Sequence, residues 1–327
     1  METLEGAELC FPELLNTSCR KKVRPHSEAT LLYILLSCIS LLTVALNVLV
    51  IISISHFRQL HTPTNLLLLS LAVSDLLCGL LLPVEFLFAE ACWLFGDLVC
   101  TLSFFLVFSV ISVSVGNMVL ISVDRYVAIC YPLRYPTKMT HRRVQICVCL
   151  CWLISAFCSS LTINDLLIQP GRYNSCVGEC VVVLNYIAGT VDLVLSFIIP
   201  FTIIIVLYMR VFVVAVSQAR AMRSQTVAVT HQRSGTVKKS EMKAARTLGV
   251  VISVFVMCFC PYYCVTLAGE NSLVSASSLF FFIFLFYLSS CLNPVIYAFF
   301  YPWFRKAIKL IVTLQILQPG SHEANIL

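Results

Sequence analysis

Charge is scarce in this sequence. Asp, Glu, Lys and Arg make up only 12% of its 327 residues, whereas soluble domains carry about 25%. Glycine and proline are also few, at 11 and 12 residues, which excludes a collagen-like fibre. The hydrophobic share of 59% excludes a disordered chain and could supply about seven or eight spans of ~20 residues. We therefore expect a membrane protein that crosses the bilayer several times.

Seven stretches of the chain are long, apolar and almost free of charge. Each could cross about 30 Å of hydrocarbon as an α-helix, and the alternating ~10-residue pattern of a membrane β-barrel is absent. The predicted spans are residues 29–55, 64–89, 98–123, 144–168, 181–209, 247–268 and 273–301. We predict an all-α membrane protein with an N-terminal segment (1–28), a seven-transmembrane helix bundle (29–301) and a short amphipathic eighth helix with a tail (302–327).

Basic residues are distributed unevenly between the two sides of such a bundle. Of the 22 Lys and Arg residues, 17 follow the first, third, fifth or seventh span. The positive-inside rule therefore predicts an outer N-terminus and a cytoplasmic C-terminus. We expect the bilayer to be the plasma membrane. The net charge of +6 follows from this topology, so the charges indicate a lipid bilayer as partner and no nucleic acid.

The N-terminal segment has no apolar core of the kind that a cleavable signal peptide carries. We expect the first span to serve as its own insertion signal. The sequon Asn16-Thr17-Ser18 lies on the predicted outer side, which favours glycosylation of Asn16.

Cysteine is abundant, with 17 residues, but most lie inside spans, where Cys behaves as a small buried hydrophobe. The spans contain no His and no matched Cys-x-x-Cys pairs, so no metal centre of that kind is predicted. Six cysteines face the oxidising side, where disulfides persist: Cys10, Cys19, Cys92, Cys100, Cys176 and Cys180.

One marker in each span carries a resemblance to a known family. The markers are Asn47, Asp75 within Leu71-Ala72-Val73-Ser74-Asp75, Cys100 with Asp124-Arg125-Tyr126, Trp152, Pro200 with Tyr208, Pro261, and Asn293-Pro294-Val295-Ile296-Tyr297. This ordered set resembles the rhodopsin-like (class A) G-protein-coupled receptors, from about Cys10 to Lys309.

Within that family the chain is most similar to the trace amine-associated receptors. The similarity lies in Ser290-Cys291-Leu292-Asn293-Pro294, in Tyr301-Pro302-Trp303-Phe304 and in the outer cysteines, although Ser289 stands where the group usually has Asn. The resemblance implies a small amine ligand, a heterotrimeric G protein as partner, cyclic-AMP-raising coupling and an olfactory role. It also implies disulfides Cys100–Cys180 and Cys19–Cys176, and leaves Cys10 and Cys92 unassigned.

Carboxylates in the spans need an explanation, because a charge at bilayer depth costs about 2.5–3.5 kcal/mol. Amine receptors of this family usually pair the ligand ammonium with an Asp seven residues after the third-helix Cys, and this chain has Val107 there. An apolar residue would leave an ammonium unpaired. Asp192, eight residues before Pro200, offers a carboxylate on the opposite wall. The alternative is a protonated Asp192 that is hydrogen-bonded between helices.

Three further acidic residues lie in or near the spans. Glu85 is either a second anionic contact, which would favour a diamine, or a solvated acid at the rim, and Asp165 is expected at the solvated rim. Asp75 matches the family's sodium-site Asp, with Ser114 and Asn293 as co-ligands, or it has a hydrogen-bonding role in switching. The sodium ion is the only bound cofactor that the resemblance implies.

An amine cavity also needs aromatic faces for cation–π contact and for the carbon chain of the ligand. The resemblance places five aromatic side chains at the cavity: Phe104, Phe108, Tyr262, Tyr263 and Tyr287.

The predicted switch lies at the inner end of the third span. The resemblance implies that Arg125, beside Asp124 and Tyr126, forms an inactive-state ion pair with Glu241, which breaks to admit a G protein. Tyr208 and Tyr297, the latter following Asn293-Pro294, would then hold the open state. Phe259 stands where the family's sixth-helix switch is typically Trp.

Other classes of function find less support. A transporter predicts internal repeats, and none is detectable. An enzyme needs a nucleophile–base pair or a metal cluster in the spans, and none of the usual motifs occurs, so we predict no enzymatic activity. Residues 272–301 lack the Lys that a retinal Schiff base requires. A class A receptor for a non-amine ligand remains the main alternative, because Val107 removes the commonest amine anchor.

Overall fold

The computed structural model describes residues 8–14, 16–20, 26–90, 92–225, 249–250, 252–264 and 276–326, and these residues form helices without β-strands. The α-helices are α1 (His26–His56), α2 (Pro63–Glu90), α3 (Gly96–Cys130), α4 (Tyr135–Lys138), α5 (His141–Thr162), α6 (Asn164–Ile168), α7 (Tyr186–Leu193), α8 (Ile199–Gln225), α10 (Ala276–Phe300) and α11 (Pro302–Val312). A further apolar helical stretch runs over Ile252–Cys264. Short turns are η1 (Arg58–Leu60), η2 (Pro132–Arg134), the π-helical η3 (Val194–Ile198), η4 (Gln315–Leu317) and η5 (Ser321–Glu323).

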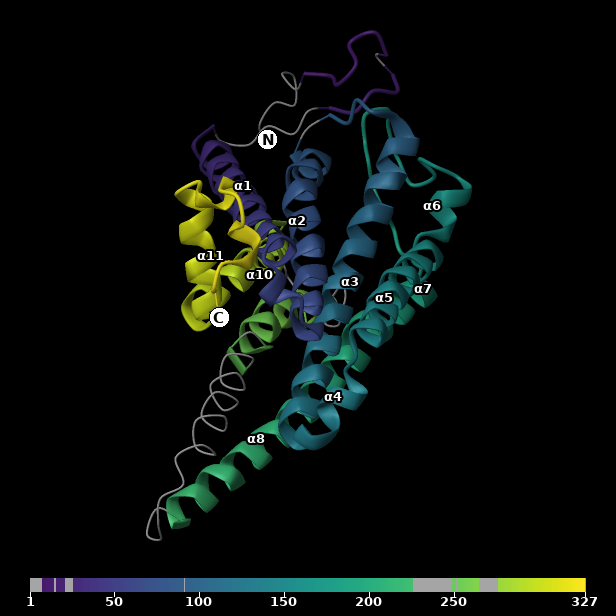
Figure 1. Cartoon of the computed structure of the whole chain (residues 1–327). Helices are drawn as coiled ribbons and strands as arrows, with labels where there is room; N and C mark the ends of the chain where they lie inside the picture. Colours follow the sequence, from purple (N-terminus) through teal and green to yellow (C-terminus); the bar gives the residue numbers. More distant parts are fainter. Residues whose placement is uncertain are drawn as a thin grey trace.

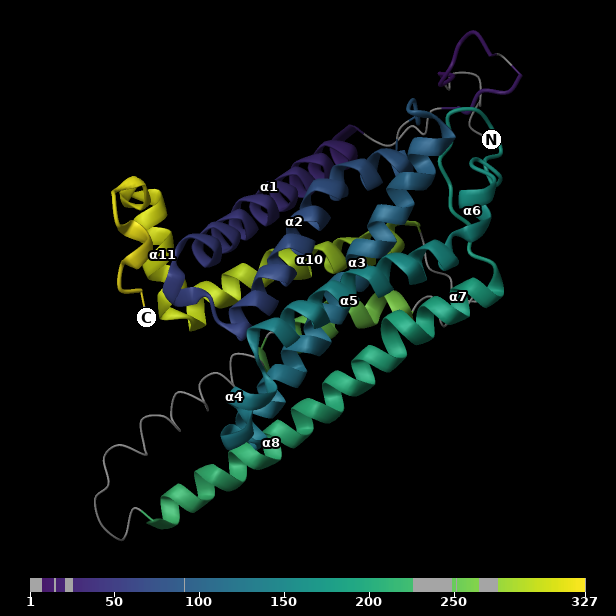
Figure 2. The same cartoon turned by 45° about the vertical axis from the view of Figure 1, so that its right-hand side comes forward.

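The long helices lie side by side as a bundle (Figures 1 and 2). Five are long and apolar enough to cross a membrane, α10 with the bent α11 makes a sixth candidate, and Ile252–Cys264 is a shorter apolar helix. α2 and α3 are the most enclosed, whereas α1, α5 and α8 turn rows of Leu, Ile and Phe outward, as lipid-facing helices do. The predicted all-α bundle is confirmed.

Several helices begin or end away from the limits of the predicted spans. α3 continues beyond residue 123 to Cys130, because charged residues at its inner end are still helical. The predicted fourth span ends early, since α5 stops at Thr162 and the short α6 follows. Residues 181–185 are not helical, and Asn185 caps α7 by accepting a hydrogen bond from Ala188 N over 2.7 Å. Hydropathy alone does not separate an apolar loop from a span.

The predicted amphipathic eighth helix is α11. It bends 102° away from α10 at Tyr301, where Pro302 opens the new helix. It buries Trp303, Phe304 and Ala307 and packs against α1, as Figure 2 shows. The chain then turns back along α11 (Figure 1).

Candidate functional site

Three disulfides cover one end of the bundle, which we call the disulfide end. The structure joins Cys100 to Cys180 and Cys19 to Cys176, the two pairs that the resemblance implied. Cys10 and Cys92, which were left unassigned, form the third disulfide. Main-chain bonds from Cys19 N to Val177 O (3.0 Å) and from Val177 N to Thr17 O (2.7 Å) add to the connection. The N-terminal segment is thus attached to two loops above the helices.

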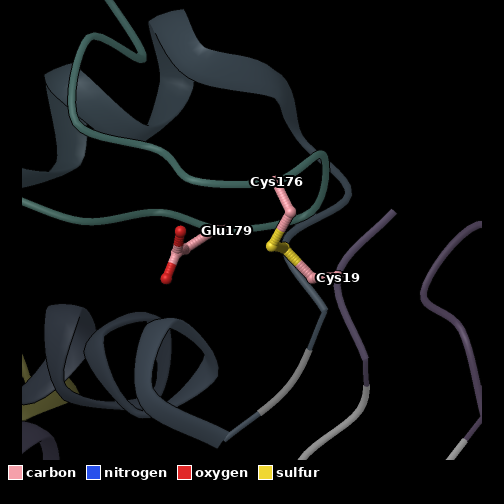
Figure 3. A group of neighbouring side chains, drawn as sticks. All are labelled: Cys19, Cys176 and Glu179. Carbon is pink, nitrogen blue, oxygen red and sulfur yellow. A yellow bond between two sulfur atoms is a disulfide. The ribbon is translucent and has the colours of Figure 1, made fainter. Parts of the chain in front are cut away.

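One disulfide lies beside a carboxylate (Figure 3). Cys19, Cys176 and Glu179 are close enough to hold a metal ion by distance alone, but the two sulfur atoms are bonded to each other and are not available as thiolate ligands. Glu179 instead accepts hydrogen bonds from Ser175 N (2.7 Å) and Ser175 Oγ (2.6 Å). The cluster is therefore structural.

Asp192 lies on α7, two residues before the π-helical turn η3 begins at Val194. Its Oδ1 atom accepts a hydrogen bond from Ser196 Oγ over 3.0 Å, and the side chain is partly buried. No Lys, Arg or His among the described residues forms an ion pair with it. π-helical turns occur frequently at functional sites, because they change the direction of the side chains along a helix.

Aromatic rings lie next to this carboxylate. Tyr263 lies close to Asp192 and stacks on Phe197, with ring centroids 4.4 Å apart and an interplanar angle of 16°. Tyr262 meets Tyr263 edge to face at 5.2 Å, and the ring series continues through Phe286 to Tyr287. Three predicted aromatic residues therefore belong to one ring network with Asp192 beside it.

The other predicted ligand residues are less closely connected to Asp192. Phe104 packs against the Cys100–Cys180 disulfide together with Trp93, and Phe108 is partly buried on α3. Val107 is buried. Glu85 belongs to α2, but its side chain lies outside the described residues.

Asp75 is fully buried in the middle of the bundle. Asn293 Nδ2 donates to its Oδ2 atom over 2.8 Å, and the hydroxyls of Ser114 and Ser290 approach the same carboxylate. Ser289 donates to Phe286 O instead, so the residue that departs from the family pattern is satisfied within its own helix. Carboxylate and hydroxyl oxygens are the ligands that hard cations prefer; Asp75 and Ser114 offer such oxygens, whereas Asn293 presents its NH2 group to the carboxylate.

Arg125 is held at the opposite end, which we call the Arg125 end. Its guanidinium binds the buried carboxylate of Asp124 and the hydroxyl of Thr64. Thr64 Oγ1 and Tyr135 OH each donate to Asp124 over 2.9 Å. Glu241, the predicted ion-pair partner, lies outside the described residues. Thr64 and Tyr135 were missed, because no local sequence signal connects them to residues some 60 and 11 positions away.

The remaining predicted switch residues are Phe259, Tyr208, Tyr297 and Tyr126. Phe259 is fully buried, with the Phe255 ring 4.0 Å and the Phe286 ring 4.1 Å from its own. Tyr208 lies directly against Gly249. Tyr297 is buried below Pro294, and its hydroxyl has no hydrogen-bond partner among the described residues. Tyr126 contacts Tyr131 at the Arg125 end.

Comparison with known proteins agrees with this geometry. Residues 46–297 match the family described as 7 transmembrane receptor (rhodopsin family). The chain is 37% identical to trace amine-associated receptor 13c of Danio rerio over 98% of this chain and 97% of that receptor. It is 37% identical to trace amine-associated receptor 5 of Rattus norvegicus (98% and 96% covered) and 34% identical to trace amine-associated receptor 1 of Homo sapiens (96% of each).

These relatives are receptors and not enzymes, and the similarity covers nearly the whole chain. The resemblance carried by the span markers is therefore confirmed, and the chain belongs to the rhodopsin family of seven-transmembrane receptors, as a relative of the trace amine-associated receptors.

Proposed function

We propose that this chain is a receptor for small amines and that Asp192 binds the ligand ammonium. The observation that carries the proposal is the state of Asp192: a partly buried carboxylate with one hydroxyl partner, a neighbouring aromatic ring and no cation of the described residues paired with it. A charge at this depth is costly unless a cation balances it. A ligand ammonium would supply that cation.

The surroundings of Asp192 suit the rest of such a ligand. Tyr263 and its ring neighbours offer aromatic faces for the ammonium and for the carbon chain. Val107 offers no charge on α3, so the ammonium would point toward α7. We also propose Glu85 as a second anionic contact, in which case diamines bind more tightly than monoamines.

Signalling would pass through the Arg125 end. In the proposed topology the disulfide end is extracellular, Asn16 is glycosylated, and the Arg125 end faces the cytoplasm. Release of Arg125 from Asp124 and Thr64 would admit a heterotrimeric G protein that raises cyclic AMP. Asp75 with Ser114 and Asn293 would hold a sodium ion in the resting bundle. An olfactory role is proposed from the relationship to the trace amine-associated receptors.

The experiment is a screen of monoamines and diamines of graded chain length on cells that report cyclic AMP. Wild type is compared with Asp192→Asn and Glu85→Ala. The control is Asp165→Asn, because the Asp165 carboxylate already accepts hydrogen bonds from Tyr173 and Asn185. Loss of a buried charge partner costs roughly 30- to 5,000-fold in affinity, and we expect this for every amine only with Asp192→Asn, whereas Glu85→Ala should remove the preference for diamines. An unchanged concentration–response curve for well-expressed Asp192→Asn would exclude the assignment.

A further inference from the structure

The segment after α11 folds back onto the turn between α1 and α2. Ser321 Oγ lies 3.0 Å from His56 Nε2, and Glu323 pairs with Arg58 over 3.4 Å. The main-chain N–H of Ile326 donates to Gln59 Oε1 over 3.2 Å. We call residues 321–326 the clip; it lies close to the end of α1 (Figure 1).

The clip is fixed mainly by its apolar end. Ile326 is fully buried and belongs to the main core cluster, as do Phe57, which precedes η1, and Leu60, the last residue of η1. By contrast, the Arg58–Glu323 pair is about 70% exposed on both sides, and exposed pairs contribute little. Docking of the clip therefore depends on Ile326 more than on charge.

Two backbone conformations support the return of the chain. Leu314 has a φ of 57° and Gly320 a φ of 80°, both in the left-handed region. A residue with a side chain rarely adopts this conformation unless its surroundings hold it there. Ser321 Oγ also donates to Ile316 O over 2.6 Å, which closes the second turn. The reversed path is thus built into the chain on both sides of η4.

The turn that the clip covers is connected to the Arg125 network. Gln59, whose side-chain oxygen accepts the hydrogen bond from Ile326 N, precedes Leu60, whose carbonyl accepts a hydrogen bond from Asn65 Nδ2 over 2.9 Å. Asn65 follows Thr64, whose hydroxyl donates to Asp124 and receives the Arg125 guanidinium. A short series of contacts therefore joins the clip to the residues that hold Arg125.

We infer that the clip is an autoinhibitory contact: by fixing η1 and the start of α2, it keeps Thr64 against Arg125 and so favours the resting state. This inference rests on the proposed function, because it assumes that release of Arg125 activates a G protein. The occupant of the α1–α2 turn is this chain's own residues 321–326, and activation loosens it. Since coupling is reciprocal, an activating ligand should increase exchange in the clip.

The test uses full-length receptor in nanodiscs with two separate readouts. Hydrogen–deuterium exchange of the peptide over 315–326 measures docking, and basal nucleotide exchange on an added G protein measures activity. The main variant is Gly320→Ala. A Cβ at this position would meet no atom within 4 Å, so the substitution acts only by disfavouring the left-handed backbone conformation of residue 320. It should weaken docking by roughly 5- to 30-fold.

A second variant, Ile326→Asp, removes the buried apolar contact and should weaken docking by roughly 10- to 100-fold. The matched controls are Glu323→Gln, which should stay within about twofold of wild type, and Ile326→Val, which should weaken docking by only about 2- to 10-fold. Thr64→Val, at the other end of the contact series, should raise basal activity and, by the same reciprocity, increase hydrogen exchange in the clip.

We expect Gly320→Ala and Ile326→Asp to raise basal nucleotide exchange by about 2- to 30-fold, the usual range of coupling between sites. Faster hydrogen exchange in the clip with basal activity unchanged would overturn the inference, and so would rapid exchange of residues 315–326 in wild type. If no amine activates any variant while the clip is protected, the proposed function fails and the docking itself stands.

Discussion

The hydroxyl of Tyr135 donates a hydrogen bond to Asp124 over 2.9 Å, so the carboxylate that binds Arg125 is also held from α4. Tyr135→Phe removes this donor and leaves the ring in place. A hydrogen bond of this kind contributes about 0.5–1.5 kcal/mol, so we expect basal G-protein activation to rise about 2- to 10-fold. Basal nucleotide exchange by the purified variant checks this, and a value equal to wild type would contradict it.

The same hydroxyl should act independently of pH in the physiological range. Burial raises the pKa of Tyr135 above its usual value of 10. A raised pKa means that the contribution is complete below about pH 10 and is lost only as the pH rises through the folded-state pKa. The difference between wild type and Tyr135→Phe should therefore be constant from about pH 6 to pH 9. A difference that disappears within that interval would show that another group is responsible.

Tyr208 depends on the absence of a side chain at Gly249. A Cβ at position 249 would lie 2.8 Å from Tyr208 Cζ. Two non-bonded carbon atoms do not approach this closely, so Gly249→Ala must displace the ring. Because Tyr208 is proposed to hold the open state, we expect lower amine-stimulated activity together with a lower melting temperature. Gly189→Ala is the matched control, since its nearest neighbour is at 3.9 Å. Wild-type activity and stability for Gly249→Ala would refute the role of this contact.

The sequence predicted much of this arrangement, because hydropathy and span markers fix the order and faces of membrane helices. Asp192 was identified because charge is rare in the spans, and Ser196, one helical turn further on, could have been found from its spacing alone. Thr64 and Tyr135 could not, since only tertiary packing brings them to Asp124. The Cys10–Cys92 pairing and the clip likewise depend on loop paths that no period in the sequence describes.

Ser196 orients the carboxylate that we propose as the amine anchor. Ser196→Ala leaves the charge of Asp192 and removes the hydrogen bond at its Oδ1 atom. We expect a loss of amine affinity of about 2- to 10-fold, far smaller than for Asp192→Asn. Thr202→Val is the control, because its hydroxyl is bonded only to Ile198 O on the exposed side of α8. Competition binding distinguishes the two, and equal affinities would exclude an orienting role for Ser196.

Among the described residues, Leu133 is the most exposed large apolar side chain at the Arg125 end, with 94% of its surface accessible. It lies in η2, between the helix that carries Arg125 and the helix that carries Tyr135. If a G protein docks there, Leu133→Ala should lower its activation about tenfold, as for an interface anchor worth more than 1 kcal/mol. Amine affinity in the absence of G protein should not change, and Leu133→Met should retain activity. Normal activation by Leu133→Ala would place the G protein elsewhere.

The three disulfides close a single covalent ring. From Cys10 the path runs to Cys19, across to Cys176, on to Cys180, across to Cys100 and back along the chain to Cys92. Because the other two bonds are already formed, the Cys10–Cys92 bond closes a loop of roughly 20 residues and not one of 82. Replacing both cysteines by Ser should therefore cost about 3 kcal/mol and lower the melting temperature without abolishing folding.

The control for the Cys10→Ser/Cys92→Ser variant is the Cys100→Ser/Cys180→Ser variant. That disulfide connects the 175–180 loop directly to α3 and packs against Trp93 and Phe104, so its removal should cost more and should also weaken amine binding. Thermal unfolding and amine affinity are measured for both double variants. The prediction is wrong if Cys10→Ser/Cys92→Ser prevents surface expression while Cys100→Ser/Cys180→Ser does not. In that case the fold of the disulfide end depends more on the Cys10–Cys92 bond than on the Cys100–Cys180 bond.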